Sequence, residues 1–144
     1  LLMRATSGIS LAAAVLFVLC ANSSFAQEAK ALSSADLAVQ TSKWEGRLVE
    51  ATFRCFYADK DEFRCIAGRA RVDFSEIVPA EARAELENKC DTIEGAARRP
   101  ECSVKVRFTY EGSDIQQSGI SSLTVVSAKD GKGEIIPTAK KKRR

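Results

Sequence analysis

The chain has 144 residues, of which 22 are Lys or Arg and 19 are Asp or Glu, giving a formal net charge of +3 at neutral pH. It contains no histidine, which excludes Ser-His-Asp and Cys-His nucleophile systems and removes the commonest metal ligand. The run Lys140–Arg144 holds five of the cations, so residues 27–139 carry a net negative charge and the basic character belongs to the tail. A chain of this length forms one domain with a single core of modest size.

The N-terminal segment has the pattern of a secretory signal peptide. Arg4 provides the positive charge, Ile9–Ala21 is an apolar run, and Ser24–Ala26 ends in small residues, as signal peptides do before their cleavage site. We expect cleavage before Gln27, so that residues 1–26 are removed and the remainder is periplasmic or secreted.

Two kinds of membrane anchor are the alternatives to a cleaved signal. The apolar run is about thirteen residues long, whereas a membrane-spanning helix needs roughly 20. Cys20 lies in the zone of a lipidated cysteine, but Leu19 precedes it where a small residue is usual. We therefore expect no transmembrane anchor after cleavage.

The first elements after the signal are a short helix and two strands. Ser33–Asp36 has the pattern of a helix start, which predicts a weak helix to about Lys43 within an N-terminal segment of residues 27–43. Alternating apolar and polar residues predict a strand over Trp44–Tyr57 and a second over Glu62–Phe74. The phase of the second strand slips at Gly68, which indicates a bulge or a sharp bend.

A helix and two further strands complete the predicted domain. Pro79 opens a helix over Ala80–Cys90, with Ala82 and Leu86 on its inner stripe. A third strand covers Cys102–Glu111 and is broken at Gly112–Asp114. A last strand covers Ile120–Ala128 and ends at Asp130–Gly133. The domain thus spans residues 44–136, and residues 137–144 form a disordered basic tail.

Four cysteines remain after cleavage: Cys55, Cys65, Cys90 and Cys102. An even number in an oxidising compartment predicts two disulfides, for which three connectivities exist. If the polar turn 58–62 closes a hairpin, Cys55 and Cys65 lie directly opposite each other, within disulfide range. Cys90 then pairs with Cys102, which ties the end of the helix to the start of the next strand.

The expected fold class is mainly β (α+β), with one core helix and two disulfides. Trp44–Gly46, the bend at Gly68 and the helix between Phe74 and Cys102 give an order of elements over most of residues 44–128 that resembles a small oligonucleotide/oligosaccharide-binding (OB) barrel. An OB barrel has three strands before its helix, and a third is obtained here if the second strand divides at Gly68. An antiparallel sheet covered by one helix is the alternative.

Cations gather on the polar faces of the predicted strands. They are Arg54, Arg64, Arg69, Arg71, Lys105 and Arg107. Such a face binds an anionic polymer through guanidinium forks; the alternative is a solvated face on which Glu50, Asp73 and Glu111 balance the cations.

Two further candidates for binding lie outside these strands. The tail residues Lys140, Lys141, Lys142, Arg143 and Arg144 are candidates for contact with anionic lipid or polysaccharide, or else a solubilising terminus. Trp44, the only tryptophan, is either a stacking platform for a ligand or a plug at one end of the core.

The sequence offers little catalytic chemistry. It has no C-x-x-C pair and no phosphate-binding glycine loop, and Asp59, Asp61 and Glu62 have the pattern of a solvated turn, so we expect no cofactor and no metal. The expected function is that of an exported, non-catalytic binding or structural domain that contacts an anionic envelope polymer or a protein partner. Nucleic acid is not expected in this compartment. The alternatives are a secreted enzyme acting through carboxylates such as Glu45 and Glu50, and an inhibitor of a secreted enzyme.

Overall fold

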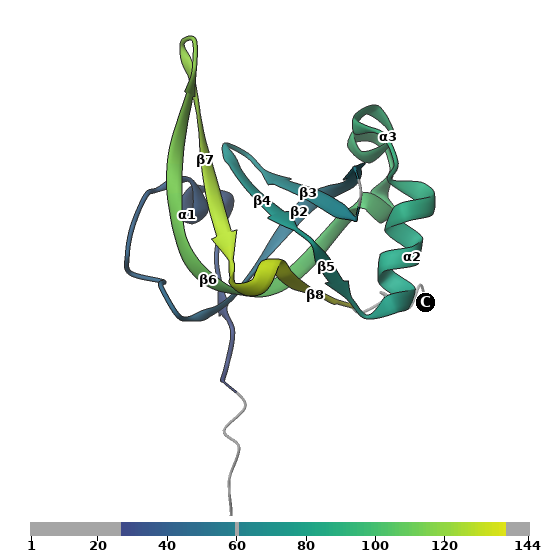
Figure 1. Cartoon of the computed structure of the whole chain (residues 1–144), viewed down its shortest axis with the longest axis horizontal. Helices are drawn as coiled ribbons and strands as arrows, with labels where there is room; N and C mark the ends of the chain where they lie inside the picture. Colours follow the sequence, from purple (N-terminus) through teal and green to yellow (C-terminus); the bar gives the residue numbers. More distant parts are fainter. Residues whose placement is uncertain (1–26, 60, 138–144) are drawn as a thin grey trace, which may run out of the picture.

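The computed structural model describes residues 27–59 and 61–137. The chain is mainly β, as expected, and Figure 1 shows its elements. The strands are β1 (Lys30–Ala31), β2 (Leu48–Asp59), β3 (Glu62–Ala67), β4 (Ala70–Phe74), β5 (Glu76–Val78), β6 (Ser103–Ser118), β7 (Ser121–Ala128) and β8 (Lys132–Ile136). The helices are α1 (Ser34–Ala38), α2 (Ala80–Lys89) and α3 (Ile93–Arg98), with short 3-10 turns at Pro100–Cys102 and Lys129–Gly131.

The strands form one mixed sheet. Successive pairings lead from β2 through β3, β4, β7 and β6 back to β2, so these five strands make a closed circuit. The β4–β7 pairing is parallel and the other four are antiparallel. The expectation of a purely antiparallel sheet is therefore wrong. The sheet is not a plain small barrel either, because β1, β5 and β8 add outlying pairings to the circuit.

The predicted second strand is two strands. Ala67 pairs with Ala70, so Gly68 and Arg69 form the turn of a β3–β4 hairpin. Gly68 has φ +56°, a conformation that glycine adopts without steric cost. The slip in the hydrophobic phase therefore marks a reversal of the chain, and the sharp bend expected at this glycine is confirmed.

The predicted break at Gly112–Asp114 is wrong, since β6 continues to Ser118. The register of the β6–β7 pairing shifts between Tyr110 and Ser113, and Gly112 takes φ +115° at this irregularity. A β-bulge thus absorbs the glycine without ending the strand. As a result, β6 and β7 project from the body of the domain as a long hairpin (Figure 1).

Both ends of the domain differ from the prediction. Helix α1 starts as expected, with a capping box between Ser33 and Asp36, but it ends at Ala38. Strand β2 begins only at Leu48, after a turn at Gly46 whose φ is +75°. At the C-terminal end, the predicted stop at Asp130–Gly133 is only partly right: a 3-10 turn covers Lys129–Gly131, but β8 begins at Lys132 and includes Gly133.

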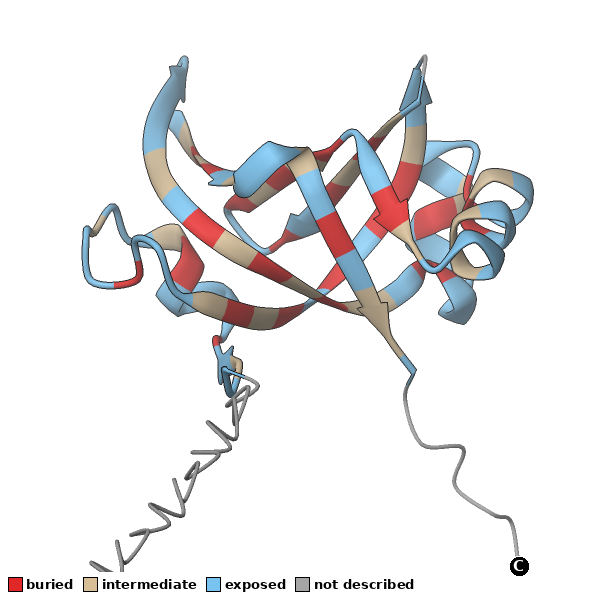
Figure 2. Cartoon of the chain, turned by 60° about the horizontal axis from the view of Figure 1, so that its bottom comes forward, coloured by how far each residue is buried: buried red, intermediate tan, exposed pale blue. Residues whose placement is uncertain are grey.

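The core lies inside the strand circuit. Buried and exposed residues alternate along the strands, as Figure 2 shows. The rings of Phe53, Phe74 and Phe108 meet at its centre, with centroids 6.4, 6.1 and 5.5 Å apart. Such tilted and edge-on arrangements are the favoured geometries of aromatic pairs.

The predicted disulfide pairing is confirmed. Cys55 and Cys65 are direct partners in the β2–β3 pairing and their Cα atoms lie 4.1 Å apart. Cys90 and Cys102 are bonded with a Cα separation of 5.8 Å. Helix α3, which was not predicted, lies within the loop that this second disulfide closes.

Candidate functional site

The six cations predicted to face outward lie on or beside four strands of the circuit. Arg54 is on β2, Arg64 on β3, Arg71 on β4, and Lys105 and Arg107 on β6. Arg69 lies in the β3–β4 turn and is exposed. We call these six residues the cationic strand face. Each is exposed or half-buried, whereas its neighbours within the strands are mostly buried in the core.

Two acids organise four of these cations. Glu50 accepts a hydrogen bond from Arg107 at 3.2 Å and lies 3.9 Å from the Lys105 ammonium. On β4, Asp73 forms ion pairs with Arg64 of β3 at 3.3 Å and with Arg71 at 3.4 Å. Half-exposed ion pairs of this kind add at most about 1 kcal/mol each to stability, but they hold the cations at fixed places.

The positive charge of the face is only partly compensated. Each of the two acids is shared by two cations, and the described residues provide no ion pair for Arg54 or Arg69. Glu134 lies opposite Arg107 in the β6–β8 pairing. Positive and negative charges are therefore closest to equal in number around Lys105 and Arg107 on β6. The positive excess is therefore concentrated around the β3–β4 hairpin and Arg54.

Helix α3 covers part of the same side of the sheet. Phe56 belongs by its position to the outward face of β2, yet only 7% of it is exposed, because α3 packs over β2. Arg54 Nη1 donates a hydrogen bond of 2.9 Å to the carbonyl oxygen of Ala96. This contact joins the cationic strand face to the helix.

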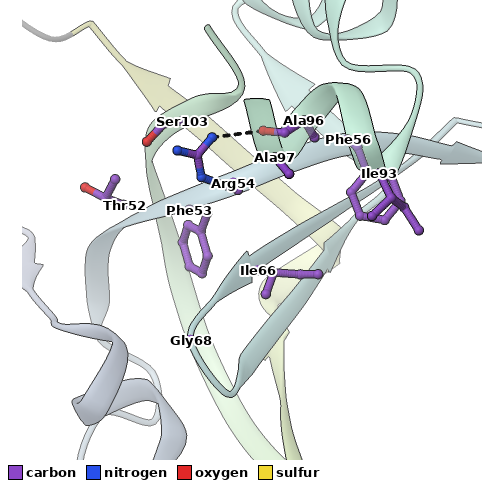
Figure 3. Close-up of a pocket in the computed structure, with 10 residues that line it drawn as sticks. All are labelled: Thr52, Phe53, Arg54, Phe56, Ile66, Gly68, Ile93, Ala96, Ala97 and Ser103. Atoms are coloured by element: carbon purple, nitrogen blue, oxygen red, sulfur yellow. Dashed lines mark hydrogen bonds between the residues drawn. The ribbon is translucent and has the colours of Figure 1, made fainter. Parts of the chain in front are cut away.

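A hollow of about 350 Å³ lies between α3 and the outer side of β2 and β3 (Figure 3). We call it the α3 hollow. Its lining consists of Thr52, Phe53, Arg54, Phe56, Ile66, Gly68, Ile93, Ala96, Ala97 and Ser103. Within the described part of the chain, this lining includes one cation and no acid.

The loop that carries α3 is held at several points. The Thr92 hydroxyl caps α3 by accepting a hydrogen bond from the Gly95 N–H at 3.0 Å. Arg99 Nη1 donates to the Lys89 carbonyl at 2.8 Å, and the Cys90–Cys102 disulfide closes the loop. The hollow is therefore formed before any ligand arrives.

The sequence analysis did not predict the α3 hollow, although the pattern of residues along β2 and β3 contains an indication of it. In the alternation of β2 and β3, Phe56 and Ile66 fall on the polar side, among arginines. Two apolar residues on an otherwise charged strand face indicate either a covering segment or a contact surface.

The remaining candidates divide between the core, a surface turn and the undescribed ends. Trp44 is 8% exposed, with Lys43 Nζ 4.8 Å above its ring, and this burial favours the core plug over the stacking platform. In the acidic turn, Asp61 accepts a hydrogen bond from Arg83 at 2.8 Å, as a surface ion pair does. The signal segment 1–26 and the tail residues Lys140–Arg144 lie outside the described residues.

The part of the chain that the structure describes holds no group of three or more His, Cys, Asp or Glu side chains arranged to bind a metal ion. Over the same residues, no helix has the length and apolar composition required to cross a bilayer. Two disulfides are typical of proteins outside the reducing cytosol. A scan of family models and searches of curated proteins and solved structures find no match to this chain.

Proposed function

We propose that this protein is an exported, non-catalytic binding domain that holds an anionic polymer of the cell envelope on the cationic strand face. The observation that carries the proposal is the excess of six cations on and beside adjacent strands over two acids, which four of the cations share. An anionic chain lying across the strands meets guanidinium groups that are already positioned by Asp73 and Glu50. Arginine forks of this kind bind carboxylate and phosphate groups in a directed way.

The proposed compartment is supported by two independent features. The two disulfides require an oxidising environment to persist, and residues 1–26 have the pattern of a cleaved signal peptide. Mass spectrometry of the exported protein is expected to find Gln27 at its N-terminus. An exported form that retains residues 4–26 would contradict the proposed cleavage.

We further propose that the fold is OB-like. The circuit β2–β3–β4–β7–β6, with the helices between β4 and β6, supports this proposal. OB folds bind extended polymers across a strand face, but fold analogy alone does not assign a ligand. The assignment therefore depends on the charges described above.

Binding can be tested by titrating the purified protein with lipopolysaccharide, an anionic glycan and anionic lipid vesicles at two salt concentrations. The triple variant Arg69→Ser, Arg71→Ser, Arg107→Ser is expected to lose affinity and discrimination among these ligands. Deleting residues 140–144 is expected to weaken all three interactions alike and to reduce their salt dependence.

The matched control removes three cations elsewhere. Lys43, Arg47 and Lys89 are exposed, and their replacement by serine changes the net charge by the same amount. If this control weakens binding as much as the face variant does, net charge and not the cationic strand face determines affinity. If the wild-type protein binds none of the ligands at low salt, the proposal is wrong.

A protein partner is the second candidate, and the β6–β7 hairpin is the observation that favours it. Ile120 at the hairpin tip is fully exposed and Ile115 is 48% exposed. An exposed apolar residue on a projecting hairpin suits insertion into a cleft of another protein, such as a secreted enzyme that this domain inhibits. Under this alternative, Ile120→Ser abolishes retention of the partner from an envelope extract while the face variant retains it.

A further inference from the structure

We propose that the α3 hollow binds an amphiphile with a single aliphatic chain and an anionic head group, of the kind represented by a medium-chain carboxylate. The chain occupies the space between α3 and the strands, and the head group lies beside Arg54. This site shares Arg54 with the cationic strand face, but its occupation does not depend on polymer binding.

The wall and floor of the hollow suit an aliphatic chain. Phe56, Ala96 and Ala97 line it, and Ile66 and Ile93 remain 37% and 62% exposed beside it. These are among the few large apolar side chains in contact with solvent in the described residues. A chain that covers them removes their apolar surface from water, which is the main source of affinity for such ligands.

The charge of the hollow selects the head group. Of the residues that the structure describes, Arg54 is the only charged one in the lining, and the hydrogen bond from Nη1 to Ala96 holds the guanidinium in place. Among the described residues no ion pair neutralises Arg54, whose remaining N–H groups are thus available to an anion. Arg71, the direct β4 neighbour of Ile66, adds positive charge on the other side of that residue. An anionic head is therefore attracted and a cationic head is repelled.

The size of the hollow limits the ligand to one short chain. A volume of about 350 Å³ lies at the lower end of the range of small-molecule sites, about 300–1,000 Å³. Figure 3 shows Ile93 beside Phe56, Ile66 on the strand side, and Arg54 joined to Ala96 by its hydrogen bond. The disulfide and the Thr92 cap already hold the α3 loop in place. Binding therefore loses little free energy to the ordering of this loop.

The first experiment measures heats of binding of octanoate, decanoate and decyltrimethylammonium to the full-length protein, below their micellar concentrations. Each buried methylene strengthens binding about fourfold, so decanoate is expected to bind at least about tenfold more tightly than octanoate. The cationic probe, whose alkyl chain is one carbon longer than that of decanoate, is nevertheless expected to bind at least about tenfold more weakly. Equal affinities of the two ten-carbon probes, or no binding of decanoate, overturn the proposal.

The second experiment places the ligand. Ile93→Ser is expected to reduce decanoate affinity about tenfold, whereas Ile120→Ser removes the same apolar group at the hairpin tip and leaves affinity unchanged. Arg54→Gln is expected to reduce affinity for decanoate, and Arg47→Gln serves as its charge-matched control. In the unmodified protein, decanoate is expected to shift the methyl NMR signals of Ile66 and Ile93 and not that of Ile120. Shifts at Ile120 alone refute the proposed site whether or not the variants fold.

Measuring both decanoate binding and polymer binding for two variants distinguishes this inference from the proposed function. Ile93→Ser is expected to reduce decanoate affinity about tenfold and to preserve polymer binding, whereas Arg107→Gln is expected to weaken polymer binding and to leave decanoate affinity unchanged. If decanoate binds while no polymer does, the polymer proposal fails and the present one stands. If Arg107→Gln weakens decanoate binding as much as Arg54→Gln does, the ligand lies on the open strand face and the hollow is not its site.

Discussion

Removing the Cys90–Cys102 disulfide is expected to lower the free energy of unfolding by about 3 kcal/mol and to release α3 from the sheet. The bond spans a sequence separation of 12 residues, for which the chain-entropy model gives about 3 kcal/mol. Both cysteines are buried, at 1% and 0% exposure. A Cys90→Ala, Cys102→Ala variant therefore also loses core contacts, which moves the loss toward the upper part of the usual range of about 2–5 kcal/mol.

Urea unfolding and limited proteolysis measure the two parts of this prediction. With m values of about 1–3 kcal/mol/M, the urea midpoint is expected to fall by about 1 M or more. Trypsin is expected to cut after Arg98, at the end of α3, much faster in the variant than in the oxidised wild-type protein.

The other disulfide provides the control. Cys55 and Cys65 are separated by 10 residues, so the Cys55→Ala, Cys65→Ala variant is expected to lose a similar amount of stability. Its α3 loop remains closed, and cleavage after Arg98 is expected to stay slow under native conditions. The reasoning fails if both double variants are cut equally fast, or if the Cys90 and Cys102 variant unfolds at the wild-type urea concentration.

Two further predictions concern single positions. A Cβ atom at Gly133 would lie 2.8 Å from the Phe74 ring, so Gly133→Ala is expected to destabilise the protein by about 1–3 kcal/mol in urea unfolding, while Glu134→Ala has little effect. Hydrogen bonds from the backbone and side chain of Ser33 lower the pKa of Asp36. Because the pKa is lowered in the folded state, the resulting stabilisation is present at neutral pH and is lost as the pH falls below the ordinary carboxyl pKa. Asp36→Asn is therefore expected to flatten the loss of stability measured between about pH 5 and pH 2.

The local pattern of the sequence was sufficient for the elements whose residues alternate regularly. The apolar positions of β2 and the polar turn after it identified the hairpin that places Cys55 opposite Cys65. Helix α3 could not be predicted in this way, because it has six residues and only Ala96 is buried among them. Its position depends on the disulfide and on the underlying Phe56, both distant in sequence from the helix itself.

The positions of glycine residues did not reliably predict where strands end. The same residue type closes a hairpin at Gly68, sits at an irregularity within β6 at Gly112, and belongs to β8 at Gly133. Gly133 lies there because Phe74 and Val106 leave no room for a side chain. That requirement comes from tertiary packing, so the local sequence could not distinguish it from a turn.

The candidate site was predicted in part. Alternation along the strands put five of the cations on the polar side, where the structure has them, whereas Arg69 lies in the β3–β4 turn. The sharing of Glu50 and Asp73 depends on cross-strand register. Glu50 lies opposite Arg107 and Asp73 lies opposite Arg64. The register of these strand pairs is determined by the packing of all five strands of the circuit, which the local sequence does not show. The α3 hollow requires in addition that the loop after Cys90 folds back over β2.

The parallel pairing of β4 with β7 has a consequence for how the chain folds. It joins Ala70 to Thr124 and Val72 to Val126, whereas the two disulfides join residues only 10 and 12 positions apart. Both bonds can therefore form on chains in which the circuit is still open, and correct oxidation does not report that β7 has docked. Closure involves contacts distant in sequence, which are the slow step in folds of high contact order. A chain that has formed both disulfides can therefore still have an unpaired β4 edge, and an unpaired strand edge is a site for aggregation.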